Sequence, residues 1–205
     1  MPRRALAAAA RSLTLFRFVA VPPFAWLLLR SPPEEPAAGG ALILLYVAVA
    51  VSDLSDGPLA RRARAASVRW GRIDVAADVT FNVSALAAAA AAGVVGPWVP
   101  AVVAVLGARF LWRTRDESRA VPAAGPARLR SDVGGKLAGV LFYLVSGAAA
   151  LHAAGVAPRG AVARFADAAA AYGALLLVWG MISDRVRGSR RATPRSPAGG
   201  SRRIP

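Results

Sequence analysis

The sequence predicts an all-α integral membrane protein with six transmembrane helices and both termini in the cytoplasm. Of its 205 residues, 56% are hydrophobic, and they fall into several long apolar runs of the kind that cross a bilayer. The formal charge is +15, and the arginines gather between these runs and in the C-terminal tail. This distribution is typical of cytoplasmic loops that face anionic lipid, so we do not expect nucleic-acid binding.

The first three spans are expected to follow a basic, amphipathic lead-in over residues 1–11. The link over residues 31–36 is rich in Pro and Glu and has no basic residue, as an outer loop should. Pro58 lacks a backbone donor and disfavours helix at the residue before it, so we expect the second span to kink or end there. The expected spans are Ser12–Leu29, Gly39–Asp56 and Asp74–Val95.

A long basic loop over Arg113–Lys136 separates the fourth span from the last two. Trp98 and Trp112 stand at the two ends of one span, like interfacial belt residues. The expected spans are Trp98–Trp112, Leu137–Leu151 and Phe165–Ile182. Residues 1–184 would form one membrane domain, and residues 185–205, rich in Arg, Ser, Pro and Gly, a disordered cytoplasmic tail.

Four aspartates stand in two pairs where the second and third spans meet the same membrane surface. Asp53 and Asp56 are three residues apart, and Asp74 and Asp78 are four apart. Each spacing places both side chains on one face of a helix. Sites built only of carboxylates suit hard divalent cations such as Mg²⁺, Mn²⁺ or Ca²⁺. The alternative is that the acids pair at the interface with the nearby arginines, which are Arg61, Arg62 and Arg64.

Soft-metal and thiol chemistry is excluded by composition. The chain has no cysteine, and His152 is its only histidine. Disulfides, thiolate metal sites and cysteine nucleophiles are therefore impossible, and zinc would lack its usual ligands. We expect His152 at the membrane face opposite the acids, without a catalytic part.

The stretch Asp53–Asp78 resembles the CDP-alcohol phosphatidyltransferase family, whose motif is D-x2-D-G-x2-A-R-x8-G-x3-D-x3-D. The residues in register are Asp53, Asp56, Gly57, Ala60, Arg61, Asp74 and Asp78. Trp70 stands where the motif has its second glycine, and Gly71 comes one residue late. The segment Ser12–Pro22 also resembles the L-T-x-x-R-x-x-x-x-P opening of the phosphatidylglycerophosphate synthase and cardiolipin synthase branches.

The resemblance implies a site with two Mg²⁺ or Mn²⁺ ions. Asp53, Asp56 and Asp74 would hold the ions against the diphosphate of a CDP-linked lipid. Asp78 would be the general base on the acceptor hydroxyl and a further metal ligand. The substrate-binding residues would be Gly57, Ala60, Arg61, Ser67 and Gly71. Arg113, Arg115 and Lys136 could grip a phosphate on the acceptor, or be ordinary positive-inside charges.

The function so implied is transfer of a phosphatidyl group from CDP-diacylglycerol to an alcohol, with release of CMP. Glycerol 3-phosphate is the first acceptor to consider, then phosphatidylglycerol, then an inositol phosphate. The sequence G-G-K-L-A-G at Gly134–Gly139 departs from the K-x-K-T motif of the glycerophosphate branch, which weakens the assignment of the acceptor. The family also implies a homodimer in a cell membrane, here bacterial, with its active site at the cytoplasmic face. A non-enzymatic divalent-cation transporter and an inactive family member remain as alternatives.

Overall fold

The computed structural model describes residues 3–30, 36–63, 68–120 and 133–192, and within these the chain is all-helical. The long apolar runs, in which β-branched strand patterns are scarce, favour helices. Only a helix satisfies every backbone hydrogen-bonding group within one apolar segment. The helices are α1 (Arg3–Arg30), α2 (Pro36–Arg62), α3 (Val68–Ala91), α4 (Trp98–Ala120), α5 (Val133–Ala153) and α6 (Arg159–Ala192).

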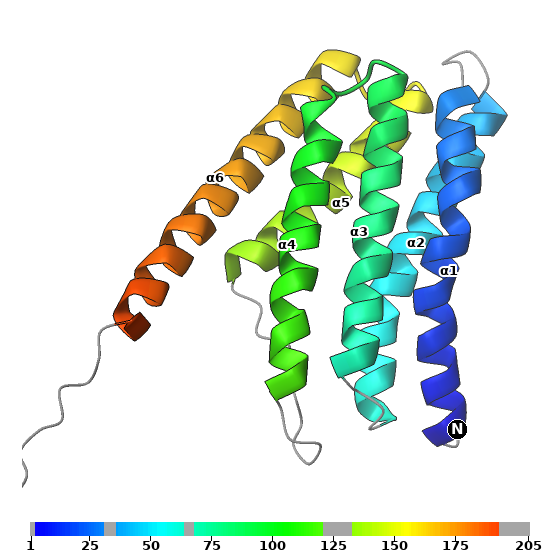
Figure 1. Ribbon diagram of the computed structural model, residues 1–205. Coiled ribbons are helices and arrows are strands. Elements are labelled where there is room, and N and C mark those ends of the chain that lie inside the picture. The colour runs from blue at the N-terminus through cyan, green and yellow to red at the C-terminus, as the bar shows by residue number, and fades with distance from the viewer. Residues whose placement is uncertain (1–2, 31–35, 64–67, 121–132, 193–205) are drawn as a thin grey trace, which may run out of the picture.

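The six helices run alternately up and down in one bundle (Figure 1). Helix α1 packs against α2 and α3, α3 packs against α4, and α5 contacts α2, α3 and α6. Helix α6 lies beside α4 and α5 at its start and diverges from the bundle toward its end (Figure 1). The start of α1 and the end of α6 lie at the same end of the bundle, which fits an even number of crossings.

Five of the six helices are long and apolar enough to cross a membrane, counted over the described residues. Helix α4 is the exception, because Arg109 and Arg113 interrupt its apolar part and further charged residues follow. The expected fourth span therefore stays a prediction. Large apolar side chains such as Val19, Leu44 and Trp179 are exposed on the outside of the bundle, as lipid-facing residues would be.

Several helix ends differ from those expected from the apolar runs. Helix α1 already begins at Arg3, and α2 continues through Pro58 to Arg62, so the proline does not end it. Helix α4 runs on to Ala120 and α6 to Ala192, into segments that we expected to be loop and tail. The reason is that apolar runs mark what a membrane covers, whereas Arg and other long polar residues also favour helix.

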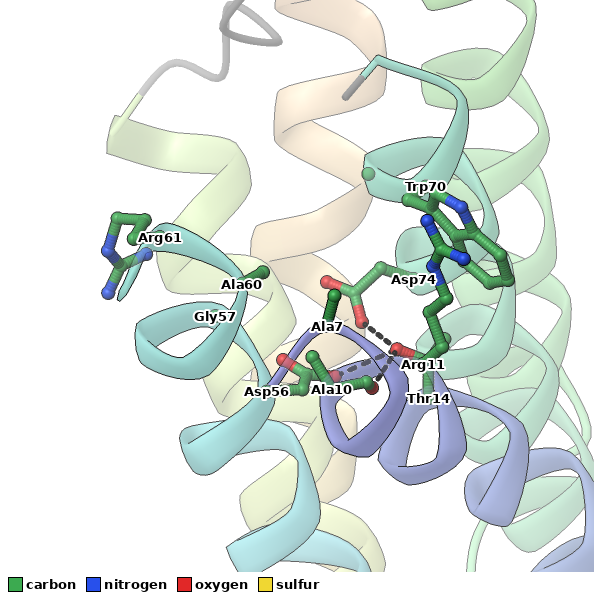
Figure 2. A pocket seen from close by; sticks show the side chains of 11 residues that line it. Ala7, Ala10, Arg11, Thr14, Asp56, Gly57, Ala60, Arg61, Trp70 and Asp74 are labelled. Carbon is green, nitrogen blue, oxygen red and sulfur yellow. Dashed lines mark hydrogen bonds between the residues drawn. The ribbon is translucent and has the colours of Figure 1, made fainter. Parts of the chain in front are cut away.

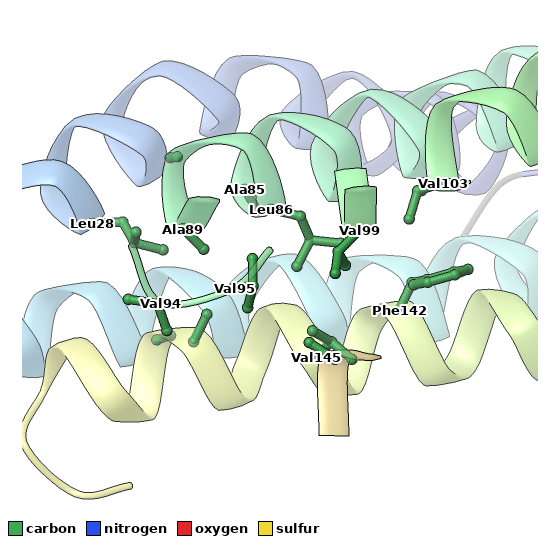
Figure 3. Packing of buried hydrophobic residues seen from close by; sticks show 14 of the residues in the cluster. Leu28, Ala85, Leu86, Ala89, Val94, Val95, Val99, Val103, Phe142 and Val145 are labelled. Carbon is green, nitrogen blue, oxygen red and sulfur yellow. The ribbon is translucent and has the colours of Figure 1, made fainter. Parts of the chain in front are cut away.

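Small residues set how closely the helices of the core approach one another. Ala85, Ala88 and Ala89 of the alanine-rich α3 are buried, and such small residues let membrane helices pack closely. The Tyr46 ring lies directly against Gly147, and a side chain there would collide with it. Around these contacts a core of aliphatic and aromatic side chains is fully enclosed (Figure 3). Its buried members include Leu42, Val49, Phe81, Leu86, Val99 and Val145.

Candidate metal centre

Helices α2 and α3 bring the four aspartates together in the half of the bundle where α1 begins. One carboxylate oxygen each of Asp53, Asp56 and Asp74 lies within 4.8 Å of the other two. Asp56 is 5% exposed, and the other side chains are partly accessible. The two pairs of the sequence thus form one cluster, as their helical spacing predicts. Asp78 stands beside this group of three without belonging to it.

Arg17 of α1 occupies the centre of the cluster. Its side chain is 0% exposed and forms ion pairs with all four aspartates, at 2.8 Å from Nη1 to Asp53 Oδ1. Nη1 also contacts Asp78, and Nη2 contacts Asp56 and Asp74. The acids therefore do not pair with Arg61 or Arg62, both of which are exposed, and Arg64 lies outside the described residues.

A threonine one turn before Arg17 adds a hydroxyl to the same cluster. Thr14 Oγ1 lies 3.1 Å from Asp56 Oδ2 and 3.5 Å from Asp74 Oδ1. It is also 3.3 Å from the carbonyl oxygen of Ala10, to which helical Ser and Thr commonly donate. Thr14 is buried, so its hydroxyl is a fixed part of the site.

Asp78 is held by a separate set of polar groups from α3 and α5. The Tyr143 hydroxyl donates to Asp78 Oδ1 over 3.0 Å, and Asn82 Nδ2 donates to the backbone carbonyl of Asp78. Ser146 in turn donates to Asn82 Oδ1, and the Tyr46 hydroxyl donates to the carbonyl of Tyr143. These contacts tie Asp78 to α2 and α5, so its position does not depend on α3 alone.

A pocket of about 180 Å³ opens beside the cluster, between α1, α2 and the start of α3. Asp56, Asp74 and Thr14 lie at its inner end (Figure 2). Arg61 stands on one side, while Arg11 and Trp70 stand on the other (Figure 2). The remaining lining residues are small, namely Ala7, Ala10, Gly57, Ala60 and Gly71. Because carboxylates stand at the inner end of the pocket, they would repel an anionic ligand unless a cation lay between them.

The pocket contains most of the expected substrate-binding residues. Gly57, Ala60, Arg61 and Gly71 line it, and Trp70 lines it as well, at the position where the motif has a glycine. Ser67 lies outside the described residues. Arg113, Arg115 and Lys136 do not line the pocket. Arg113 Nη2 is 3.6 Å from Asp184 Oδ1 of α6. Arg113 could therefore serve as a structural ion-pair partner or as a ligand of a phosphate.

The donor set fits a divalent cation of the Mg²⁺ type. Asp53, Asp56 and Asp74 supply only carboxylate oxygen, at separations that one ion or two neighbouring ions can span. Thr14 adds a neutral oxygen. A single guanidinium balances only one of the four negative charges, so the site has room for further positive charge.

Arg17, Thr14 and Tyr143 are the site residues that the acid motif does not reveal. For Arg17 a signal exists, because a charge within an apolar span is costly and implies a partner. Thr14 and Arg17 are the T and R of the L-T-x-x-R segment, which by itself indicates a branch of the family and not a site. Tyr143 carries no such signal, since an aromatic residue in an apolar span is ordinary.

These features define an all-helical protein of membrane-spanning type with a carboxylate-lined pocket that could hold a cation in one half of its bundle. The chain belongs to the CDP-alcohol phosphatidyltransferase family, whose sequence profile matches residues 7–182. It is also 38% identical over 74 residues to a cardiolipin synthase (CMP-forming) of Streptomyces coelicolor. That match spans 36% of this chain and 34% of the relative. No solved structure matches the chain.

Proposed function

We propose that the protein transfers a phosphatidyl group from CDP-diacylglycerol to an alcohol and releases CMP. The observation that carries this proposal is the convergence of Asp53, Asp56 and Asp74 beside a pocket, in a chain of this family. Family membership also favours an enzyme over a cation transporter that uses the same acids.

The donor would lie in the pocket with its diphosphate toward the carboxylates. Asp53, Asp56 and Asp74 would hold divalent ions there, Mg²⁺ or Mn²⁺, and two such ions would fit the family. When bound, they would neutralise the diphosphate and stabilise charge on the attacking and leaving oxygens. The absence of bulky side chains at Gly57 and Ala60 leaves space for the nucleotide, and Arg61 would face its phosphates.

Asp78 would act on the acceptor. Its carboxylate lies beside the group of three, close enough to share Arg17 with it. A carboxylate at that place can accept the proton of the acceptor hydroxyl while the bond to phosphorus forms. Tyr143 would orient Asp78 by its hydrogen bond to Oδ1.

Two acceptors follow from different observations. The L-T-x-x-R segment over Ser12–Pro22, common to the phosphatidylglycerophosphate synthase and cardiolipin synthase branches, leads us to place glycerol 3-phosphate first. The likeness to a cardiolipin synthase (CMP-forming) supports phosphatidylglycerol as the second candidate. An inositol phosphate comes third. In each case the active site would face the cytoplasm, and the family favours a homodimer.

The decisive experiment is CMP release from CDP-diacylglycerol by the purified full-length chain, with each acceptor alcohol in turn. We expect release with one acceptor, complete dependence on Mg²⁺ or Mn²⁺, and loss of activity after chelation that either ion restores. A protein that turns over fully after metal depletion would contradict the metal site. A protein that releases no CMP with any acceptor would contradict the proposed reaction.

A further inference from the structure

The guanidinium of Arg17 contacts the same aspartates that would bind a divalent cation. It contacts one oxygen each of Asp53, Asp56, Asp74 and Asp78. Three of these carboxylates are the ones whose oxygens converge to within 4.8 Å. Divalent ions bind such oxygens at about 2.0–2.6 Å. An ion at that distance and the guanidinium cannot use the same oxygens at the same time.

We propose that Arg17 is a built-in counter-cation that competes with the divalent ion, so that metal binding requires the guanidinium to leave the carboxylates. Arg17 keeps the cluster stable while no ion is bound, because an arginine stays charged under all physiological conditions. The inference rests on the proposed function in one respect, namely that the cluster binds a divalent ion.

The charge balance explains why an ion can win this competition. One guanidinium neutralises one of four carboxylates and leaves up to three negative charges in a partly enclosed site. Its Nε is buried and has no hydrogen-bond partner within the described part of the chain. Leaving a buried donor unsatisfied carries a free-energy cost. Arg17 therefore neutralises the carboxylates only in part and leaves one of its own donors unpaired. A divalent ion brings twice its charge.

The alternative is that Arg17 is a fixed structural partner that remains in place when metal binds. The two cases differ in what removal of the guanidinium does to metal affinity. Under competition, its removal makes metal binding tighter. As a fixed scaffold, Arg17 would hold the ligands in place, and its removal would leave metal binding unchanged or weaker.

The test is Mn²⁺ binding to the full-length, detergent-purified chain by calorimetry, with the Arg17→Gln variant and wild type compared after chelation and chelator removal. We expect the Kd of the variant to be lower by about tenfold or more, since a unit charge next to a divalent ion matters even with the screening of water. We also expect a lower Tm than wild type in chelator, and a larger rise of Tm on addition of Mn²⁺.

Arg30→Gln is the matched control. It removes the same charge from the same helix, but Arg30 lies at the end of α1, 5.3 Å from the centre of the Trp26 ring, and makes none of the four ion pairs. Its Kd for Mn²⁺ should change far less. If Arg17→Gln cannot be purified, Arg17→Lys decides the matter, because an ammonium keeps the charge but cannot bridge four carboxylates. The lysine variant should bind Mn²⁺ more tightly than wild type.

Equal or weaker Mn²⁺ binding by the Arg17 variants, with normal binding by wild type, would overturn the competition and leave the proposed function intact. Absence of Mn²⁺ binding by every protein would overturn both the competition and the metal centre. CMP release by wild type, measured separately, reports on the transfer reaction alone.

Discussion

Replacing Asp56 and Asp78 singly by asparagine should separate two tasks within one cluster of carboxylates. Asp56 is almost fully buried, faces the pocket and belongs to the converging group of three. Asp78 lies outside that group and is held by Tyr143. We expect Asp56→Asn to weaken both CDP-lipid binding and turnover, and Asp78→Asn to abolish transfer while CDP-lipid binding is largely kept.

The expected magnitudes follow from these positions. Two unit charges 4 Å apart interact by about 4 kcal/mol at an effective dielectric constant of 20. If desolvation cancels half of that, loss of the Asp56 charge costs about 2 kcal/mol, or roughly thirtyfold in ion affinity. The diphosphate that depends on the ion should lose affinity to a similar extent. Loss of a general base at Asp78 should lower the rate by about 10²–10⁴-fold.

The assay is CMP release together with CDP-diacylglycerol affinity for both variants, each in lipid nanodiscs with saturating Mg²⁺. Asp167→Asn is the control, because it makes the same chemical change in the first part of α6, where Asp167 accepts a 2.9 Å hydrogen bond from Trp98 at the start of α4. It should leave both quantities near wild type. Equal loss of CDP-lipid affinity in the two site variants would mean that Asp78 is a metal ligand first, and the separation of roles would be wrong.

Two further predictions concern topology and packing. Single cysteines placed at Glu35 and Ser189 of this cysteine-free chain should label from opposite sides of the membrane, Ser189 from the cytoplasm, and labelling from one side would refute the topology. Gly39→Ala should lower the free energy of unfolding by about 1–3 kcal/mol, because its new Cβ would stand 2.6 Å from Ala154 Cα. Gly40→Ala is the control and should cause no such loss, because nothing lies within 4 Å of its new Cβ. Equal Tm values of the two alanine variants would contradict the close contact of α2 with Ala154, which directly follows α5.

The carboxylate cluster could be predicted because its geometry is local. The spacing of Asp53 and Asp56, and of Asp74 and Asp78, determines the helix face on which each pair lies. Only one short connection then separates the two helices, so the pairs were expected to meet. The family motif independently identifies the same aspartates, and most of the small residues of that motif line the pocket.

The partner of the acids could not be predicted in the same way. Arg17 lies 36 residues from Asp53 and 61 from Asp78, on a helix whose rotation about its own axis is set by packing. The nearby Arg61 and Arg62 are closer to the acids in sequence, yet both are exposed and neither forms an ion pair with them among the described residues. Tyr143 likewise reaches Asp78 only through the docking of α5 against α3.

Helix ends were predicted less well than helix positions. Hydropathy identifies the part of a helix that lipid covers, and α1, α4 and α6 continue beyond that part into charged segments. At the other end of the bundle the ends are sharper. Gly93 and Gly155 adopt positive φ, at 71° and 74°, and so terminate α3 and α5, as C-terminal glycines commonly do.

The buried position of Arg17 has a consequence for biogenesis. Chains are synthesised from the N-terminus, so α1 reaches the bilayer before the helices that carry its four partners. An arginine near the centre of a lone inserted helix costs about 2.5–3.5 kcal/mol. Helix α2 brings two of the compensating aspartates, and α3 brings the other two. The first three helices are therefore the smallest unit in which the translocation machinery can release α1 with all of its charge partners in place.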